Sequence, residues 1–181
     1  MSKLAFIFPG QGAQKAGMGK DFYENSEAAR SFFDNAQEIL DFDLKEMCFG
    51  EHEELNLTEY TQPCMVSVCL AIVQELKKRG INPDITAGLS LGEYAAVAAA
   101  GGMNELNAIK LVRRRGILMQ NTVPTGEGAM AAVLGLDAKK IEEILESFEN
   151  VWIANYNCPG QIVITGLTNE VKQASLALKE A

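Results

Sequence analysis

Gly88-Leu89-Ser90-Leu91-Gly92 is the stretch that decides the fold of this sequence. It follows strand-like residues 84–87 and precedes a run of small residues, 93–100, that favours a helix. A strand, a sharp turn and a helix, with glycines around a serine, form the pattern of a nucleophile elbow, in which small residues let a strained turn expose the serine hydroxyl. The same short pattern occurs in plain turns. The flanking elements therefore carry the prediction of an α/β fold with Ser90 at a strand end.

A second junction between a strand and a turn lies at the N-terminus. Residues 4–8 predict a fully buried strand, and Pro9-Gly10-Gln11-Gly12 ends it. This turn is either a simple connection to a helix or a source of backbone N–H groups for a site. If Ser90 is a nucleophile in acyl transfer, the N–H of Leu91 is one expected oxyanion donor, and the glycine-rich turn is a candidate for the second.

Apolar residues recur at helical spacing over much of the chain between these turns and after them. The pattern predicts one helix over 21–40, an acidic surface loop at 51–54 and a second helix that begins after Thr61-Gln62-Pro63 and ends at Gly80. Asn104 is expected to cap a further helix that reaches about residue 123.

Residues 124–128, Pro124-Thr125-Gly126-Glu127-Gly128, contain one proline and two glycines. This composition predicts a linker between two domains. We expect residues 1–123 to form a large subdomain and residues 124–181 a smaller one. The smaller part predicts strands and helices in the order βαββα, over 129–134, 137–148, 151–155, 161–165 and from 168 onward. This order is that of a ferredoxin-like unit without its last strand.

Composition narrows the classes of function. A formal charge of -8 with a pI near 4.8 argues against nucleic acid and membrane surfaces as partners, because an acidic field repels phosphates and anionic head groups. The apolar run at 4–8 is too short for a signal segment or a membrane span, so we expect a cytoplasmic protein. The four cysteines form no CxxC pair and only one histidine is present, so we expect no metal site, and reduced, mostly buried thiols.

Arg115 is the most informative charged residue. Its neighbours at helical spacing are apolar, which predicts that it lies on a buried stripe, whereas Arg113 and Arg114 are expected nearer to solvent. A buried guanidinium needs an anion, since an unpaired buried charge costs roughly 3–5 kcal/mol. The anion is either a carboxylate of the protein or a carboxylate of a substrate, and the residues favour the first.

A nucleophilic serine ordinarily needs a base. His52, the only histidine, stands between Glu51 and Glu53. Flanking carboxylates favour an exposed imidazolium on an acidic loop, which is a poor base for Ser90.

Six motifs together carry a resemblance to a known family. They are FPGQGAQ at 8–14, TQP at 61–63, GLSLGE at 88–93, RRRG at 113–116, GAMAAVLGL at 128–136 and NYNCPGQIVITG at 155–166. In this order over nearly the whole chain, they closely resemble the malonyl-CoA:acyl carrier protein transacylases and related acyltransferase domains.

The resemblance implies an α/β-hydrolase-like large subdomain with a ferredoxin-like small subdomain. It implies transfer of a malonyl group from malonyl-CoA to the phosphopantetheine thiol of acyl carrier protein in fatty acid biosynthesis, without a cofactor. The resemblance further implies that Ser90 forms the malonyl ester, that the backbone N–H groups of Gln11 and Leu91 make the oxyanion hole, and that Arg115 pairs with the malonyl carboxylate. The last assignment replaces the structural role that the residues alone favour.

Two departures from the family pattern stand out. The family usually has a histidine before its nucleophile, where this sequence has Leu89. Its catalytic histidine lies beyond the final strand of the small subdomain, past residue 181. We therefore expect a C-terminally truncated transacylase, whose partners include the missing segment or a second copy joined through exposed strand edges. The alternative is a catalytically silent module that binds malonyl-CoA or a carrier protein. The third hypothesis is a serine thioesterase or esterase from another family.

Overall fold

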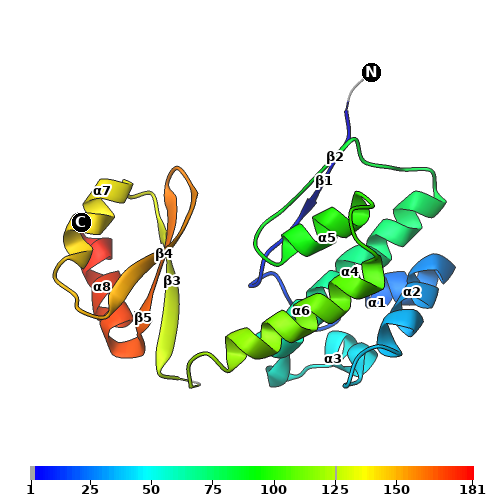
Figure 1. The fold of residues 1–181 in the computed structure, drawn as a ribbon, viewed down its shortest axis with the longest axis horizontal. Coiled ribbons are helices and arrows are strands. Elements are labelled where there is room, and N and C mark those ends of the chain that lie inside the picture. Colours follow the sequence, from blue (N-terminus) through cyan, green and yellow to red (C-terminus); the bar gives the residue numbers. More distant parts are fainter. Residues whose placement is uncertain (1–2, 125) are drawn as a thin grey trace. The chain divides into compact units, whose positions relative to one another are not determined.

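A computed structural model describes residues 3–124 and 126–181 of the chain. Contacts within the chain divide it into two compact units, Met1–Asn121 and Thr122–Ala181 (Figure 1). Thr125, in the middle of the linker that the sequence predicts, lies outside the described residues.

The first unit contains a small parallel sheet and most of the helices. Strands β1 (Ala5–Phe8) and β2 (Ile85–Gly88) pair in register, from Ala5 opposite Ile85 to Phe8 opposite Gly88. The helical elements are α1 (Lys20–Asn25), α2 (Glu27–Gln37), α3 (Leu44–Phe49), the 3-10 turn η1 (Glu53–Asn56), α4 (Thr58–Lys78), α5 (Gly92–Ala99) and α6 (Glu105–Gln120).

The long helix predicted over 21–40 is two helices, because the chain turns at Ser26. This residue is extended, with φ -126° and ψ 117°, and its hydroxyl accepts a hydrogen bond from the Ala29 N–H, so it caps α2. Serine at such a position satisfies one of the free N–H groups at a helix start. The helix predicted from Asn104 is present, and the Asn104 side chain caps α6 by accepting from the Asn107 N–H.

Helix α4 is the central element of the first unit. Much of its length is enclosed, and its buried residues join those of α2, α5 and α6 in one hydrophobic core. It begins at Thr58, earlier than the sequence predicts, so that Pro63 lies inside the helix.

Strand β1 is not fully buried as predicted. Phe8 reaches the core with 5% of its surface exposed, but Ile7, on the other face of the strand, is 77% exposed. Ile85 on the paired strand is 55% exposed. An unbroken apolar run predicts burial on both faces, whereas here one face of the two-stranded sheet meets solvent.

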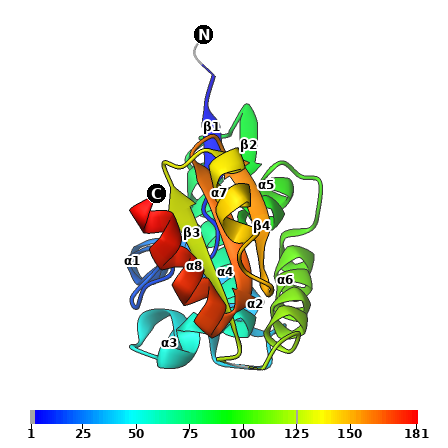
Figure 2. The same ribbon diagram turned by 90° about the vertical axis from the view of Figure 1, so that its left-hand side faces the viewer.

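The second unit contains the predicted elements in the order βαββα: β3 (Gly128–Leu134), α7 (Ala138–Leu145), β4 (Val151–Cys158), β5 (Gln161–Leu167) and α8 (Thr168–Glu180). The strands form an antiparallel sheet in the order β3-β5-β4. Figures 1 and 2 show α7 and α8 on one side of this sheet. Residues Ile141, Ile164 and Ala174 are fully buried between the helices and the strands.

The cysteines of the described residues are all free thiols. Cys48 and Cys64 are buried, Cys69 is half-buried and Cys158 is exposed. Within 3–124 and 126–181, no three side chains of the metal-ligating types come together as a candidate metal site. Across the same ranges, every helix is too short or too polar to traverse a lipid bilayer.

Candidate active site

Ser90 occupies the turn between β2 and α5 in a strained conformation. Its φ is 52°, and it is the only non-glycine residue with positive φ in the described parts of the chain. The left-handed region costs an L-residue roughly 1–2 kcal/mol. Such strain is typical of a residue whose side chain the surrounding structure holds in a required place.

Two glycines make this turn sterically possible. A Cβ on Gly88 would lie 2.1 Å from the carbonyl carbon of Gly92, and a Cβ on Gly92 would lie 2.4 Å from the carbonyl oxygen of Phe8. Neither glycine has a positive φ, so close approach of the backbone is what requires them. Strand β2 and the start of α5 therefore cross in contact with the end of β1.

The glycine-rich turn after β1 lies against the elbow. The Leu89 N–H donates to the Phe8 carbonyl over 3.1 Å. A Cβ on Gly10 would come within 3.0 Å of the Leu89 carbonyl oxygen. Because β1 and β2 are parallel, the turns that follow them leave the same edge of the sheet. The two turns predicted as candidate site elements are thus neighbours.

Each of the two turns has a backbone N–H group that makes no hydrogen bond within the described residues. In the described part of the chain, neither Gln11 nor Leu91 uses its N–H in a hydrogen bond. Leu91 directly precedes α5, where the helix dipole favours negative charge, and its side chain is 1% exposed. The Gln11 side chain is held separately, since its Nε2 donates to Thr58 Oγ1 over 3.1 Å.

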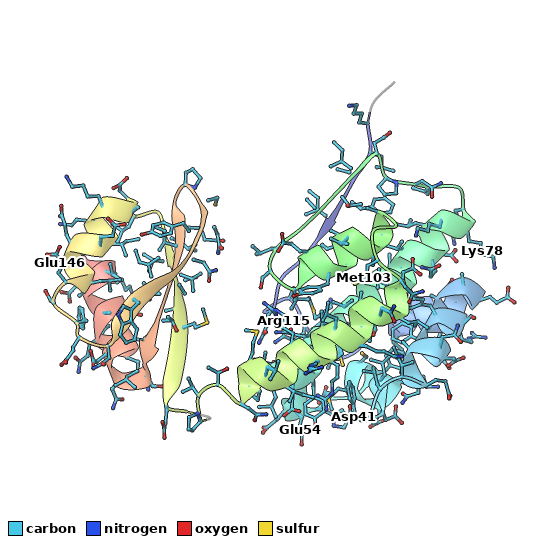
Figure 3. All side chains as sticks on the ribbon, viewed as in Figure 1. Asp41, Glu54, Lys78, Met103, Arg115 and Glu146 are labelled. Carbon is cyan, nitrogen blue, oxygen red and sulfur yellow. The ribbon has the colours of Figure 1, made fainter. Side chains whose placement is uncertain are left out.

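Arg115 reaches the elbow from α6. Its Nη2 lies 3.3 Å from Ser90 Oγ, and its guanidinium stands 5.7 Å from the centre of the Tyr94 ring; Figure 3 labels Arg115 on α6. Among the residues that the structure describes, no carboxylate forms an ion pair with it. The protein carboxylate that the residues alone favoured as its partner is therefore not found among the described residues.

The predicted exposure is wrong for Arg113 and confirmed for Arg114, which is exposed. Arg115 is half-buried, and two of the apolar neighbours that suggested a buried stripe, Leu111 and Leu118, are 44% and 62% exposed. Arg113 is the enclosed arginine, with 13% of its side chain exposed and ion pairs to Asp41 and Glu59. Helical spacing identifies one apolar face, but a long side chain can turn its charge away from that face toward a carboxylate from another segment.

His52 directly precedes η1 and is half-buried, so its predicted exposure is only partial. Its Nε2 is 3.0 Å from Glu46 Oε1, and 32% of its side chain is exposed. The ring is engaged with a carboxylate of α3, and no hydrogen bond joins it to Ser90 in the described residues.

Two residues that contact the candidate site residues, and one buried polar residue of α4, were missed as individual candidates. Thr58 receives the Gln11 side chain, and Tyr94 underlies the Arg115 guanidinium. Gln62 is fully buried; its Nε2 lies 3.3 Å from Met119 Sδ, and its Oε1 has no partner among the described residues. Of these three residues, only Gln62 belongs to a motif of the sequence, TQP. Its amide side chain beside a proline was the one signal that the sequence offered.

Known proteins match this chain over nearly its whole length. The family model described as acyl transferase domain matches residues 5–181. The malonyl CoA-acyl carrier protein transacylase of Bacillus subtilis (strain 168) is 48% identical over 185 residues, covering 99% of this chain and 58% of that protein. This chain therefore spans only 58% of the length of the Bacillus subtilis protein, and 55% of the length of a transacylase of the same name from Staphylococcus aureus (strain MSSA476).

Solved structures agree with the fold. The transacylase of the same name from Clostridium perfringens is 43% identical with a TM-score of 0.88, covering 99% of this chain and 58% of that one. A malonyl-transacylase solved in complex with a type II PKS acyl-carrier protein is 38% identical with a TM-score of 0.90, covering 99% and 60%. The predicted α/β class, with a large subdomain and a ferredoxin-like small one, is confirmed.

Proposed function

This chain belongs to the acyl transferase domain family, and we propose that it provides the acyl-binding half of a malonyl transacylase site. In this proposal a malonyl group passes from malonyl-CoA to the phosphopantetheine thiol of acyl carrier protein, by way of an ester on Ser90, in fatty acid biosynthesis. No cofactor is required, since the coenzyme A thioester is itself the substrate.

The observation that carries the proposal is the cation beside the nucleophile. Arg115 Nη2 lies 3.3 Å from Ser90 Oγ, and no described carboxylate neutralises it. A guanidinium binds a carboxylate through two parallel hydrogen bonds. An acyl group with a free carboxylate, such as malonyl, places its anion on Arg115 while its thioester carbon faces Ser90.

The proposed chemistry has two halves of the same kind. Ser90 Oγ attacks the thioester carbon and gives its proton to a base; an O–C bond forms, the C–S bond breaks, and the base passes the proton to the leaving sulfur, so that coenzyme A leaves as a thiol. The carrier thiol then gives its proton to the base and attacks the ester carbon; a C–S bond forms, the C–O bond to Ser90 breaks, and the base returns the proton to Ser90 Oγ. The N–H groups of Gln11 and Leu91 bind the negative oxygen of each tetrahedral intermediate. We do not assign the base to His52, because its ring is bonded to Glu46.

The direct test is labelling of the 181-residue chain with malonyl-CoA carrying an isotope in the malonyl group. We expect an ester on Ser90, located by peptide mass, and transfer of the label to a pantetheine thiol in preference to water. Release to water alone indicates a thioesterase or esterase instead. Binding of malonyl-CoA without any ester, even when imidazole is supplied as an external base, indicates a silent binding module.

A further inference from the structure

Pro63 leaves a backbone carbonyl of α4 without its helical partner. In an α-helix the N–H at position 63 would bond to the carbonyl of Glu59. Proline has no N–H, and its ring crowds that carbonyl. Because Pro63 lies inside α4 rather than at its start, the Glu59 carbonyl needs a donor from elsewhere.

Arg113 of α6 is that donor. Its Nη1 lies 2.8 Å from the Glu59 carbonyl oxygen and 3.1 Å from Glu59 Oε2. The other edge of the guanidinium binds Asp41 through Nε and Nη2, at 2.8 and 3.0 Å. The planar group also stands 5.2 Å and 5.1 Å from the centres of the Phe42 and Tyr60 rings. Only a planar fork with several donors can make all these contacts together.

Gly116 and Gln120 lie on the same face of α6 as Arg113 and also contact α4. We call this contact the α4–α6 junction; it consists of Arg113, Gly116 and Gln120 of α6 and Thr58 and Glu59 of α4. A Cβ on Gly116 would lie 2.8 Å from both Glu59 Cα and the Thr58 carbonyl oxygen, so the helices touch backbone to backbone. Gln120 Oε1 accepts from the Thr58 N–H over 2.9 Å, at a helix start that has no side-chain cap of its own.

The junction fixes the rotation of α6 about its axis. Side chains on a helix keep fixed angular positions relative to one another. Arg113 holds one side of α6 against Glu59 and Asp41, and Arg115 then reaches toward Ser90 and Tyr94 on another side. In Figure 3 the labelled Asp41 and Arg115 lie on opposite sides of the α6 ribbon.

We propose that Arg113 is a positioning residue for the substrate carboxylate: by making the hydrogen bond that Pro63 cannot make, it fixes α6 and so the place of Arg115. The inference rests on the proposed role of Arg115. It also links the two site turns, since Thr58 of the junction accepts the hydrogen bond from Gln11.

Calorimetric binding of malonyl-CoA and acetyl-CoA to the 181-residue chain tests this role. The ratio of the two Kd values reports how well Arg115 meets a carboxylate. Arg113→Met keeps an apolar stem between the two rings but removes the fork, and we expect the ratio to fall about tenfold, because small displacements of a positioned group have large effects. The matched control is Arg114→Met, an exposed neighbour in the same motif, which should leave the ratio unchanged.

A second variant separates positioning from general stability. Pro63→Ala gives α4 an N–H for the Glu59 carbonyl, so Arg113→Met in that background should lose less of the discrimination than it does alone. Loss of the Asp41 ion pair by itself cannot produce this rescue. If Arg113→Met does not fold, as judged by circular dichroism, Asp41→Asn takes its place, because it loosens the fork on one edge only; a partial fall in the ratio is then expected.

The outcomes are distinct. An unchanged ratio in a folded Arg113→Met or Asp41→Asn chain, when the unaltered chain prefers malonyl-CoA, overturns the positioning role and leaves the proposed function intact. No preference for malonyl-CoA in the unaltered chain removes the proposed function of Arg115, and the positioning role with it. Equal falls in Arg113→Met and in Arg113→Met with Pro63→Ala contradict the link to Pro63.

Discussion

Arg115 donates a hydrogen bond to Ser90 across 3.3 Å, between Nη2 and Oγ, so the cation lies directly beside the proposed nucleophile. The distance is slightly longer than that of an ordinary N–H···O hydrogen bond. A carboxylate is a better partner for a guanidinium than a neutral hydroxyl. We therefore expect a bound dicarboxylic acyl group to take over the guanidinium and release the hydroxyl for attack.

Ser90→Ala should abolish the ester formed from malonyl-CoA while the chain stays folded. The hydroxyl is the proposed nucleophile, and in this structure Arg115 is its only hydrogen-bond partner among the described residues. Peptide mass after incubation with labelled malonyl-CoA measures the ester. Equal labelling of the alanine variant would show that another residue carries the acyl group.

Ser90→Gly should be more stable than Ser90→Ala by about 1 kcal/mol, because only glycine adopts a φ of 52° without strain. Urea unfolding of the two variants measures this difference. Since neither variant has a hydroxyl, the comparison isolates the backbone. Equal stability would mean that the turn relaxes when the serine is removed.

Arg115→Ala should weaken the binding of malonyl-CoA much more than that of acetyl-CoA. Only malonyl offers a carboxylate, and a hydrogen bond to a charged group contributes roughly 1.5–3 kcal/mol. Arg115→Lys should recover part of the difference, because an ammonium lacks the planar fork. Calorimetry with both thioesters measures the effect, and equal losses for both would make the arginine structural.

Gly92→Ala should disrupt the elbow more than Gly102→Ala, its control. A Cβ on Gly92 meets backbone oxygens of Phe8 and Pro9 at 2.4 and 2.7 Å, whereas one on Gly102 meets only Val97, no closer than 3.1 Å. Overpacking against backbone typically costs about 1–3 kcal/mol, and the displaced turn should also lose ester formation. Thermal unfolding and labelling measure the two losses. A Gly92→Ala chain with unaltered labelling would contradict the close crossing.

The ion pair between Asp41 and Arg113 predicts a dependence of stability on pH. The hydrogen bond from Arg113 holds the pKa of the Asp41 carboxyl below its ordinary value. Because the folded pKa is lower than the unfolded one, near 4, the stabilisation is complete above about pH 4 and is lost as the pH falls through the folded pKa.

Asp41→Asn should therefore be less stable than the unaltered chain at pH 7, and this gap should shrink below about pH 4. Urea unfolding of both chains at several pH values measures it. A gap that stays constant from pH 7 to pH 2 would mean that the carboxyl stabilises the fold by shape rather than by charge.

Local patterns predicted the elbow and the second unit well. A strand that runs directly into Gly88-Leu89-Ser90-Leu91-Gly92 has little alternative to a tight turn, and the glycines are required by backbone contacts. The βαββα order followed from alternating and helical spacing in short segments with clear turns between them. In both places the order of elements follows from local sequence, although the close approach of Gly92 to Phe8 in the elbow involves a distant segment.

Contacts between distant segments decided what the sequence did not predict. The enclosure of Arg113 depends on Asp41 and Glu59, which belong to other elements, and helical spacing around Arg113 contains no sign of them. The placement of Pro63 inside α4 depends on a donor from α6. The exposure of Ile7 depends on which elements cover each face of β1, and the amino-acid sequence of the strand does not specify those elements.

The four thiols differ in burial, so one of them can be labelled selectively. Burial raises the pKa of Cys69 to about 11, and contact with Cys64 together with burial raises the pKa of the Cys48 thiol, so both remain protonated and slow to react near pH 7. Cys158, at the end of β4, is exposed. A maleimide dye added to the folded protein should therefore attach once per chain, on the smaller unit, and the emission of that dye then reports whether the surroundings of Cys158 change when a thioester is added.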